Sequence, residues 1–212
     1  MGLDLRYNLN EMKIFCIGRN YVDHAKELGN EIPEEPIIFL KPQTAYLPNN
    51  SDIPYPSFTK NFHYETEIVL KMDKKGKSIS EEKAKNFYSE LTVGLDLTAR
   101  DLQNELREKQ LPWELSKGFD SSALVGDFIP RPTDPYAMNF KLLRSGQQVQ
   151  EGHTKNLIFS FERLISFISI YFTIEQDDLI STGTPVGVGS LEKGDTVEAF
   201  VEDQKLLSSK VV

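Results

Sequence analysis

The chain has 212 residues and a formal net charge of −8, with 32 acidic residues against 24 lysines and arginines. This length favours one domain whose core is large enough to need no disulfide bonds, and the acidic balance argues against nucleic acid or an anionic membrane as a partner. The single cysteine, Cys16, cannot form an intrachain bridge, so we expect a reducing compartment and a cytoplasmic location.

Strand-like runs bounded by Gly, Pro and Asp dominate the chain. They cover residues 13–18, 36–41, 65–72, 91–97, 140–146, 178–183, 195–202 and 206–212, with a hairpin expected to turn at Ser145 and Gly146. Helical patterns cover residues 80–88, 98–110 and 160–172. Because strands and helices do not alternate regularly, we predict an α+β, mainly β fold and not a doubly wound parallel sheet. We expect a single domain over residues 13–212, after an N-terminal extension over residues 1–12.

The first motif in chain order is GRNYVDHAKE, over residues 18–27. Helical spacing would place His24 and Glu27 on one face, within hydrogen-bonding reach of each other. A carboxylate that orients an imidazole produces a general base able to deprotonate water. The alternative is an incidental pair on a surface helix, and the pair alone does not decide between the two.

The stretch HYETEIVLKM carries two glutamates, Glu65 and Glu67, separated by one residue. Side chains two apart on a strand share a face, so each carboxylate makes the other harder to ionise. A solvated strand face is one explanation. A bound divalent cation is the other, and Asp96, at the end of the run LTVGLD, could supply a third carboxylate. Asp96 could instead cap the helix expected to follow it.

Two later segments carry groups able to bind an anion. Lys117 stands beside Gly118 in LSKGFD, and a glycine-rich loop, STGTPVGVG, follows an apolar run. This loop lacks the Gly-Lys-Ser/Thr ending of a phosphate-binding P-loop, which argues against nucleotide binding. Its backbone N–H groups could still hold a carboxylate.

Taken together, these segments resemble the fumarylacetoacetate hydrolase family, and within it the small single-domain acylpyruvase and oxaloacetate decarboxylase type. The resemblance rests on KIFCIGRNYVDHAKELG, PIIFLKPQTAY, HYETEIVL, GLDLTARDLQ, LPWELSKGFDSSALVGDF, GHTKNLIFS and ISTGTPVGVG, which occur in family order from Lys13 to the C-terminus. It implies a mixed β-sandwich roll of the family's C-terminal domain type, assembled as a homodimer.

The resemblance also implies a role for individual residues. Glu65, Glu67 and Asp96 would bind one Mg²⁺ or Mn²⁺ ion per subunit, and residues 20–35 would form a lid that carries His24 and Glu27 over the substrate. Lys117 would stabilise negative charge beside the metal. The implied substrate contacts are Arg19, Tyr21, Lys41, Gln103 and Thr184. The residues expected to support the site are His63 and a salt-bridged pair, Arg100 and Asp101.

The implied reaction is the metal-dependent hydrolysis of a carbon–carbon bond in an acylpyruvate, a 2,4-diketo acid, to pyruvate and a carboxylic acid through an enolate. The same site suits decarboxylation or tautomerisation of oxaloacetate, and isomerisation of 2-hydroxyhepta-2,4-diene-1,7-dioate, because an enolate takes part in each. His24 and Glu27 favour hydrolysis, which needs an activated water. A non-catalytic protein that binds a metal and an anion is the alternative from another class.

Overall fold

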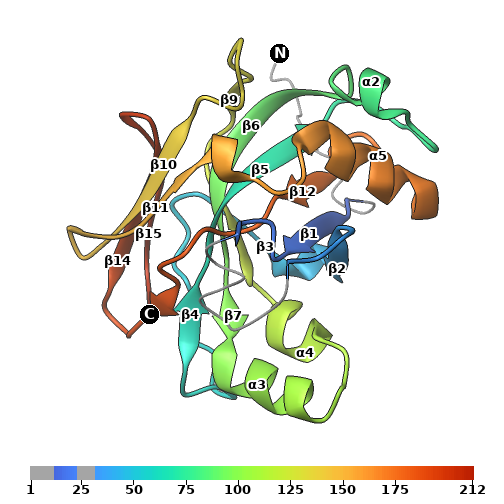
Figure 1. Ribbon diagram of the computed structural model, residues 1–212. Coiled ribbons are helices and arrows are strands. Elements are labelled where there is room, and N and C mark those ends of the chain that lie inside the picture. The colour runs from blue at the N-terminus through green and yellow to red at the C-terminus, as the bar shows by residue number, and fades with distance from the viewer. Residues whose placement is uncertain (1–11, 23–31) are drawn as a thin grey trace, which may run out of the picture.

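The computed structural model describes residues 12–22 and 32–212 (Figure 1). The largest sheet has the order β2-β1-β12-β5-β6-β8-β3, and β9 also pairs with β6. Two of its pairings, β1 with β12 and β3 with β8, are parallel and the others are antiparallel. Its strands are β1 (Ile14–Gly18), β2 (Ile37–Lys41), β3 (Tyr46–Pro48), β5 (Thr66–Met72), β6 (Tyr88–Asp96), β8 (Ala123–Val125), β9 (Ile129–Pro130) and β12 (Leu179–Ser181).

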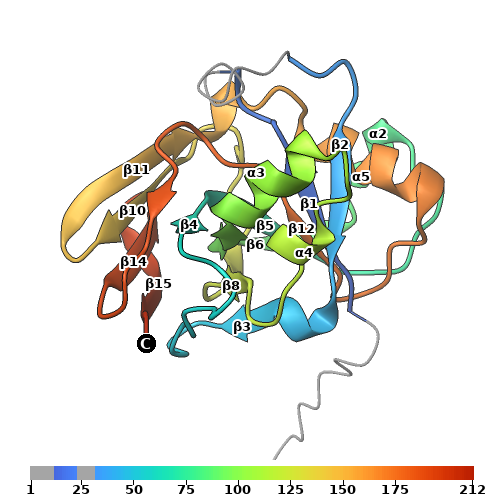
Figure 2. The same cartoon turned by 90° about the horizontal axis from the view of Figure 1, so that it is seen from below.

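A second sheet, in the order β11-β10-β14-β15, packs against the β5–β6 region of the first (Figures 1 and 2). Its strands are β10 (Asn139–Arg144), β11 (Gln147–His153), β14 (Thr196–Val201) and β15 (Gln204–Lys210). Buried side chains from both sheets, such as Val93 and Val197, belong to one apolar core. This sandwich of one mixed sheet and one antiparallel sheet confirms the predicted α+β, mainly β fold class.

A small third sheet joins β4 (Phe62–Tyr64) to β7 (Thr98–Ala99) and β13 (Gly189–Ser190). Two helices, α3 (Arg100–Glu108) and α4 (Glu114–Lys117), lie together beside β4 and β7 (Figures 1 and 2). The remaining α-helices of the described residues are α2 (Glu81–Ala84) and α5 (Phe161–Tyr171), and two 3₁₀ turns are η2 (Gln43–Ala45) and η3 (Thr154–Asn156). None of these helices is long and apolar enough to cross a membrane.

One predicted hairpin is confirmed, and two predicted helices are shorter than expected. The hairpin does turn at Ser145 and Gly146, both with positive φ, as a tight two-residue turn requires. The helix predicted over residues 98–110 begins two residues later than expected, because Thr98 and Ala99 pair with β4. The helix predicted over residues 80–88 ends at Ala84, because the chain enters β6 at Tyr88.

The strand β5 is buried on both faces, which explains how it can carry the site. Ile68 and Leu70 enter the large core between the sheets. Val69, on the other face, enters a smaller apolar cluster with Cys16 and Phe39. Glu65 and Glu67 share the face of Val69, since side chains alternate along a strand. The two glutamates therefore lie at the edge of an apolar layer and not on a solvated face.

Candidate active site

Glu65, Glu67 and Asp96 come together at one end of the β5–β6 pair. Glu67 lies opposite Gly94, and the backbone N–H of Asp96 donates to the carbonyl of Glu65 at 2.9 Å. Residues opposite each other in an antiparallel pair share a face, so all three side chains point the same way. One ligand oxygen from each carboxylate lies within 4.8 Å of the others, and all three residues are buried.

Glu67 is held from one side by the loop that follows β12. Its Oε2 accepts hydrogen bonds from Ser181 Oγ at 2.5 Å and from the backbone N–H of Gly183 at 2.8 Å. Gly183 has a φ of 98°, and a Cβ there would lie 2.7 Å from Cβ of Asn20, so only glycine fits. Burial first, and then the Asp96 carboxylate, raise the pKa of Glu67 to about 8.

Lys117 bridges the other two carboxylates. Its Nζ donates to Glu65 Oε2 at 2.9 Å, to Asp96 Oδ2 at 2.8 Å and to Thr98 Oγ1 at 2.7 Å. Burial lowers the pKa of Lys117, but Asp96 and Glu65 outweigh it, and the net pKa lies above the ordinary value. Lys117 is therefore a fixed cation inside the site and not a proton acceptor.

Lys41 lies behind Asp96 and does not line the cavity described below, although the sequence predicted a substrate contact. Its ammonium is 2.8 Å from Asp96 Oδ1 in an ion pair with both side chains fully buried. It also donates to the carbonyl oxygens of Leu97, Lys117 and Ser122. Because protein acceptors surround it, Lys41 is a buried counter-ion that ties the end of β6 to the α4 segment.

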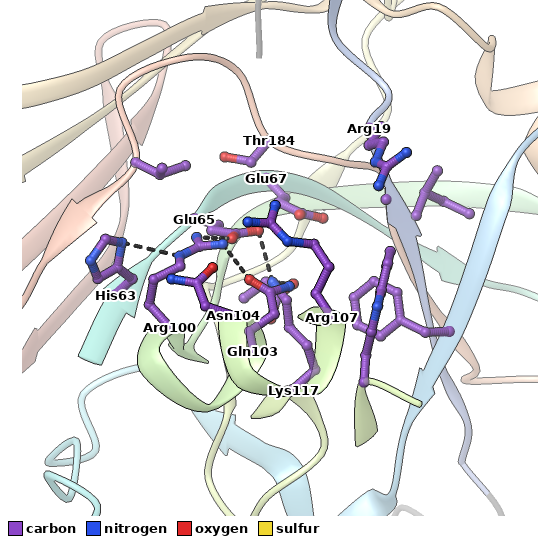
Figure 3. A pocket seen from close by; sticks show the side chains of 16 residues that line it. Arg19, His63, Glu65, Glu67, Arg100, Gln103, Asn104, Arg107, Lys117 and Thr184 are labelled. Carbon is purple, nitrogen blue, oxygen red and sulfur yellow. Dashed lines mark hydrogen bonds and ion pairs between the residues drawn. The ribbon is translucent and has the colours of Figure 1, made fainter. Parts of the chain in front are cut away.

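Arg100 organises the side of the site formed by α3 (Figure 3). Its Nη2 pairs with Glu65 Oε1 and its Nη1 donates to Gln103 Oε1. Its Nε donates to His63 Nδ1 at 3.4 Å, and the opposite nitrogen of that ring is 2.8 Å from Asn61 Oδ1. Burial, and then the charge of Arg100, lower the pKa of His63 to about 4, so the ring is neutral and can accept this bond.

Asp101 does not pair with Arg100, in contrast to the prediction. Its carboxylate accepts hydrogen bonds from the hydroxyl of Thr59 and from the backbone N–H of Lys60, the latter at 2.9 Å. One residue along a helix turns the side chain by about 100°, which carries Asp101 away from the face of α3 that holds Arg100. Asp101 therefore fixes α3 to the segment before β4, while Arg100 faces the carboxylates.

A cavity of about 360 Å³ opens over the three carboxylates. The predicted residues Arg19, His63, Gln103, Lys117 and Thr184 line it, together with Arg100. Figure 3 shows these side chains arranged around the cavity. Sequence reasoning missed seven further lining residues, which are Ile17, Gly18, Phe39, Asn104, Arg107, Trp113 and Val188. The size and the mixed lining are typical of a pocket for a small organic ligand.

The hydroxyl of Thr184, a residue that lines this cavity, already has protein partners. Its Oγ1 donates to the carbonyl of Thr66 at 2.9 Å and accepts from Gln150 Nε2 at 2.8 Å. Gln150 also donates to the carbonyl of Pro185 and accepts from the backbone N–H of Thr66. Gln150, from the second sheet, therefore clamps the glycine-rich loop to the start of β5.

Replacing Gln150 by leucine should destabilise the protein by about 1–3 kcal/mol, because it leaves the buried N–H of Thr66 without an acceptor. Urea unfolding measures this change. Gln148→Leu is the matched control, since Gln148 is exposed on the same strand and its loss should change the unfolding free energy by less than about 0.5 kcal/mol. Equal stabilities of the two variants would contradict the clamp.

Of three further predicted site residues, one lines a different cavity and two lie outside the described residues. Tyr21 is buried against Phe140, with ring centroids 6.3 Å apart, and lines a separate cavity with Val186. His24 and Glu27 lie outside the described residues, as does most of the predicted lid. Asn20, where that lid was expected to begin, is buried and bonded to the carbonyl of Thr182 at 2.8 Å.

The donor set fits a hard divalent cation. Carboxylate oxygens are the ligands that Mg²⁺ and Mn²⁺ prefer. Burial and the nearby Asp96 carboxylate raise the pKa of Glu67, and a bound cation would offset both effects. Among the described residues, Glu67 Oε1 has no hydrogen-bond partner. Asp96 Oδ1 likewise has an ion-pair contact but no hydrogen bond. Glu65, Glu67 and Asp96 are therefore the residues that would hold such an ion.

The chain is similar to proteins of one family along almost its whole length. The family described as Fumarylacetoacetate (FAA) hydrolase C-terminal matches residues 13–212. The mitochondrial oxaloacetate tautomerase FAHD1 of Mus musculus is 42% identical over 200 residues, which cover 93% of this chain and 90% of that protein.

Solved structures are similar along nearly the whole chain. The fumarylpyruvate hydrolase of Pseudomonas aeruginosa, in complex with Mn²⁺ and pyruvate, has a TM-score of 0.89 and 37% identity, covering 94% of this chain and 89% of that one. The 2-hydroxyhepta-2,4-diene-1,7-dioate isomerase of Mycobacterium marinum has a TM-score of 0.83 and 32% identity, covering 94% and 74%. The chain therefore belongs to the fumarylacetoacetate hydrolase family of enzymes.

Proposed function

We propose that this protein is a divalent-metal-dependent hydrolase that cleaves a carbon–carbon bond of acylpyruvates, giving pyruvate and a carboxylic acid. The observation that carries the proposal is the cluster of three buried carboxylates, within 4.8 Å of one another, in a cavity also lined by Arg100 and Lys117. Negative ligands for a cation and fixed cations for an anion are both needed to hold a 2-oxo acid and its enolate.

The proposed cofactor is Mg²⁺ or Mn²⁺, one ion per subunit, held by Glu65, Glu67 and Asp96. When bound, it would polarise the carboxylate and keto oxygens of the substrate and stabilise negative charge that develops there. A relative with Mn²⁺ and pyruvate in its structure supports this choice of ion and ligand.

The chain's own side chains would orient the substrate and stabilise its charge. Arg100 already binds Gln103 Oε1, so the amide N–H groups of Gln103 are the ones left for a substrate oxygen. Lys117 would share a proton with the developing enolate oxygen. The backbone N–H of Thr184 has no hydrogen-bond acceptor among the described residues and would bind the substrate carboxylate, with Arg19 as a second cation.

In the proposed reaction, His24, oriented by Glu27, would take a proton from water. The water oxygen adds to C4 of the diketo acid, and the bond between C3 and C4 breaks. The electron pair of that bond passes to the pyruvate unit as an enolate, and a proton then returns to C3. Closure of residues 20–35 over the substrate is part of the same proposal and would keep bulk water away from the enolate.

Oxaloacetate tautomerisation is the second candidate. It is favoured by the identity of 40–42% to proteins named oxaloacetate tautomerase FAHD1 in several mammals. Moving a proton between oxaloacetate and its enol needs the enolate-stabilising groups but no attacking water. Decarboxylation of oxaloacetate and isomerisation of 2-hydroxyhepta-2,4-diene-1,7-dioate would use the same groups.

We also propose that the protein is a homodimer and that it is located in the cytoplasm. A homodimer is consistent with large apolar side chains exposed at the end of α5, Ile170 and Tyr171. A cytoplasmic location is consistent with Cys16, which is a buried free thiol.

Initial rates with acetylpyruvate, oxaloacetate and 2-hydroxyhepta-2,4-diene-1,7-dioate test the proposal, each with Mg²⁺ and with a chelator. We expect acetylpyruvate turnover to need the metal, to be lost in Glu65→Ala and to fall by roughly 10²- to 10⁴-fold in His24→Ala, the usual contribution of a general base. Turnover of oxaloacetate alone, insensitive to His24→Ala, would replace the hydrolase with the second candidate. Tight metal binding without turnover of any substrate would contradict both.

A further inference from the structure

Among the described residues, the guanidinium of Arg107 has no partner, in a cavity where the other cations, apart from Arg19, are paired. The side chain of Arg107 lines the cavity over the carboxylates, and no hydrogen bond or ion pair joins that side chain to the described residues. Lys117 and Arg100, in contrast, are bound to Glu65. An unpaired guanidinium beside a pocket is free to bind an anionic group of a ligand.

The helix α3 aims Arg107 at the site. Arg100, Gln103 and Arg107 are spaced by three and four residues, so they lie on one face of the helix. Helical side chains lean toward the N-terminal end, which brings the guanidinium of Arg107 back over the turn that holds Gln103. Figure 3 shows Arg107 extending from α3 toward the carboxylates and not away from them.

The net positive charge expected around the cavity with a metal bound favours a ligand with more than one negative charge. The three carboxylates are matched by three ion-paired cations, Lys41, Arg100 and Lys117. A bound divalent ion, with Arg19 and Arg107, would then leave four positive charges for the substrate. A monocarboxylate offsets one of these charges, whereas a dicarboxylate offsets two.

We propose that Arg107 binds the second carboxylate of a 2-oxo dicarboxylic substrate, with the neighbouring Asn104 amide as an additional donor. This assignment rests on the proposed function, because it places the 2-oxo acid end of the substrate at Glu65, Glu67 and Asp96. Arg107 is then the residue that selects dicarboxylates over monocarboxylates of equal length.

The backbone that carries each arginine favours Arg107 over Arg19 for this role. Arg107 projects from a regular turn of α3, so the helix sets its direction. Arg19 lies in the turn after β1 with a φ of 60°, a conformation that costs energy for any residue but glycine. Arg19 stands beside the apolar wall of Ile17 and Gly18, whereas Arg107 shares its helix face with Arg100, which binds Glu65.

A matched pair of stable ligands tests the assignment by binding. Isothermal titration calorimetry of the full-length protein with Mg²⁺ would compare 2-oxoglutarate with 2-oxopentanoate, which has the same chain length and lacks the second carboxylate. We expect the native protein to prefer 2-oxoglutarate by roughly 10- to 100-fold, the value of a charged hydrogen-bonded pair. The Arg107→Gln variant should lose this preference while its affinity for 2-oxopentanoate stays within about threefold.

Two control variants make the result specific. Arg163→Gln, on α5 and against the ring of Phe167, should keep the native preference. Arg19→Gln should weaken both ligands equally. An unchanged preference in Arg107→Gln, or its loss in Arg19→Gln instead, would overturn the assignment. Binding alone decides the role of Arg107, so an inactive native protein that still prefers the dicarboxylate would contradict the proposed hydrolysis and uphold this inference.

Discussion

Replacing Glu67 by glutamine should weaken Mn²⁺ binding by more than about 100-fold, the upper end of what loss of a residue supporting a metal ligand costs. Glutamine keeps the size of the side chain and an oxygen that can accept from Ser181 and Gly183. The substitution therefore removes one negative charge and one strong ligand without emptying the space. Titration with Mn²⁺ followed by electron paramagnetic resonance measures the affinity directly.

The same variant should fold at least as stably as the native protein when no metal is present. Glu67 is buried beside two other carboxylates and its pKa is raised to about 8, so a neutral glutamine avoids the cost of ionising this carboxyl in the folded state. Glu105→Gln, at an exposed position on α3, is the control and should change neither metal affinity nor stability. Native-like Mn²⁺ affinity in Glu67→Gln would exclude the three carboxylates as the metal site.

Replacing Lys41 by methionine should lower the free energy of unfolding by about 3–5 kcal/mol, the cost of removing one partner from a buried ion pair. Lys41 is fully buried against Asp96, and its ammonium also binds the carbonyl oxygens of Leu97 and Ser122. All of these acceptors would lose their donor together. Urea unfolding in the presence of a chelator measures the effect without a contribution from bound metal.

A comparison with an exposed pair separates this effect from a general loss of charge. Lys205 pairs with Glu198 at 2.7 Å with its side chain 48% exposed, so Lys205→Met should cost less than about 1 kcal/mol. Added Mn²⁺ should recover part of the stability of Lys41→Met, because a cation at Asp96 replaces some of the lost positive charge. Equal unfolding free energies for the two methionine variants would show that Lys41 is not the counter-ion of Asp96.

The three carboxylates proposed to bind the metal were the most predictable part of the site, because they depend mainly on local spacing. Glu65 and Glu67 are two residues apart on an extended segment, and alternation alone puts them on one face. Asp96 joins them because β5 and β6 pair in an antiparallel register that sets it opposite Glu65. Spacing along the sequence suggested a third carboxylate, whereas the register that brings it there is a long-range property.

The cations were harder to place from the sequence. Lys41 ends an apolar strand as many surface lysines do, and nothing local shows that Leu97, Lys117 and Ser122 will surround it. Arg107 had a usable signal, its spacing of four and seven residues from Gln103 and Arg100. That signal depends on where α3 begins, and the prediction began the helix two residues early because the pairing of Thr98 and Ala99 with β4 is not visible locally.

The exchange of the methyl hydrogens of pyruvate for deuterium tests the central claim most directly, since it reports enolate formation whatever acyl group the natural substrate carries. Proton NMR in D₂O would follow the exchange with Mg²⁺, for the native protein and for Glu67→Gln. A group that protonates the pyruvate enolate must also deprotonate pyruvate, so we predict exchange that requires both Mg²⁺ and Glu67. Exchange that persists with a chelator or in Glu67→Gln, or its absence from the native protein with Mg²⁺ bound, would contradict the account.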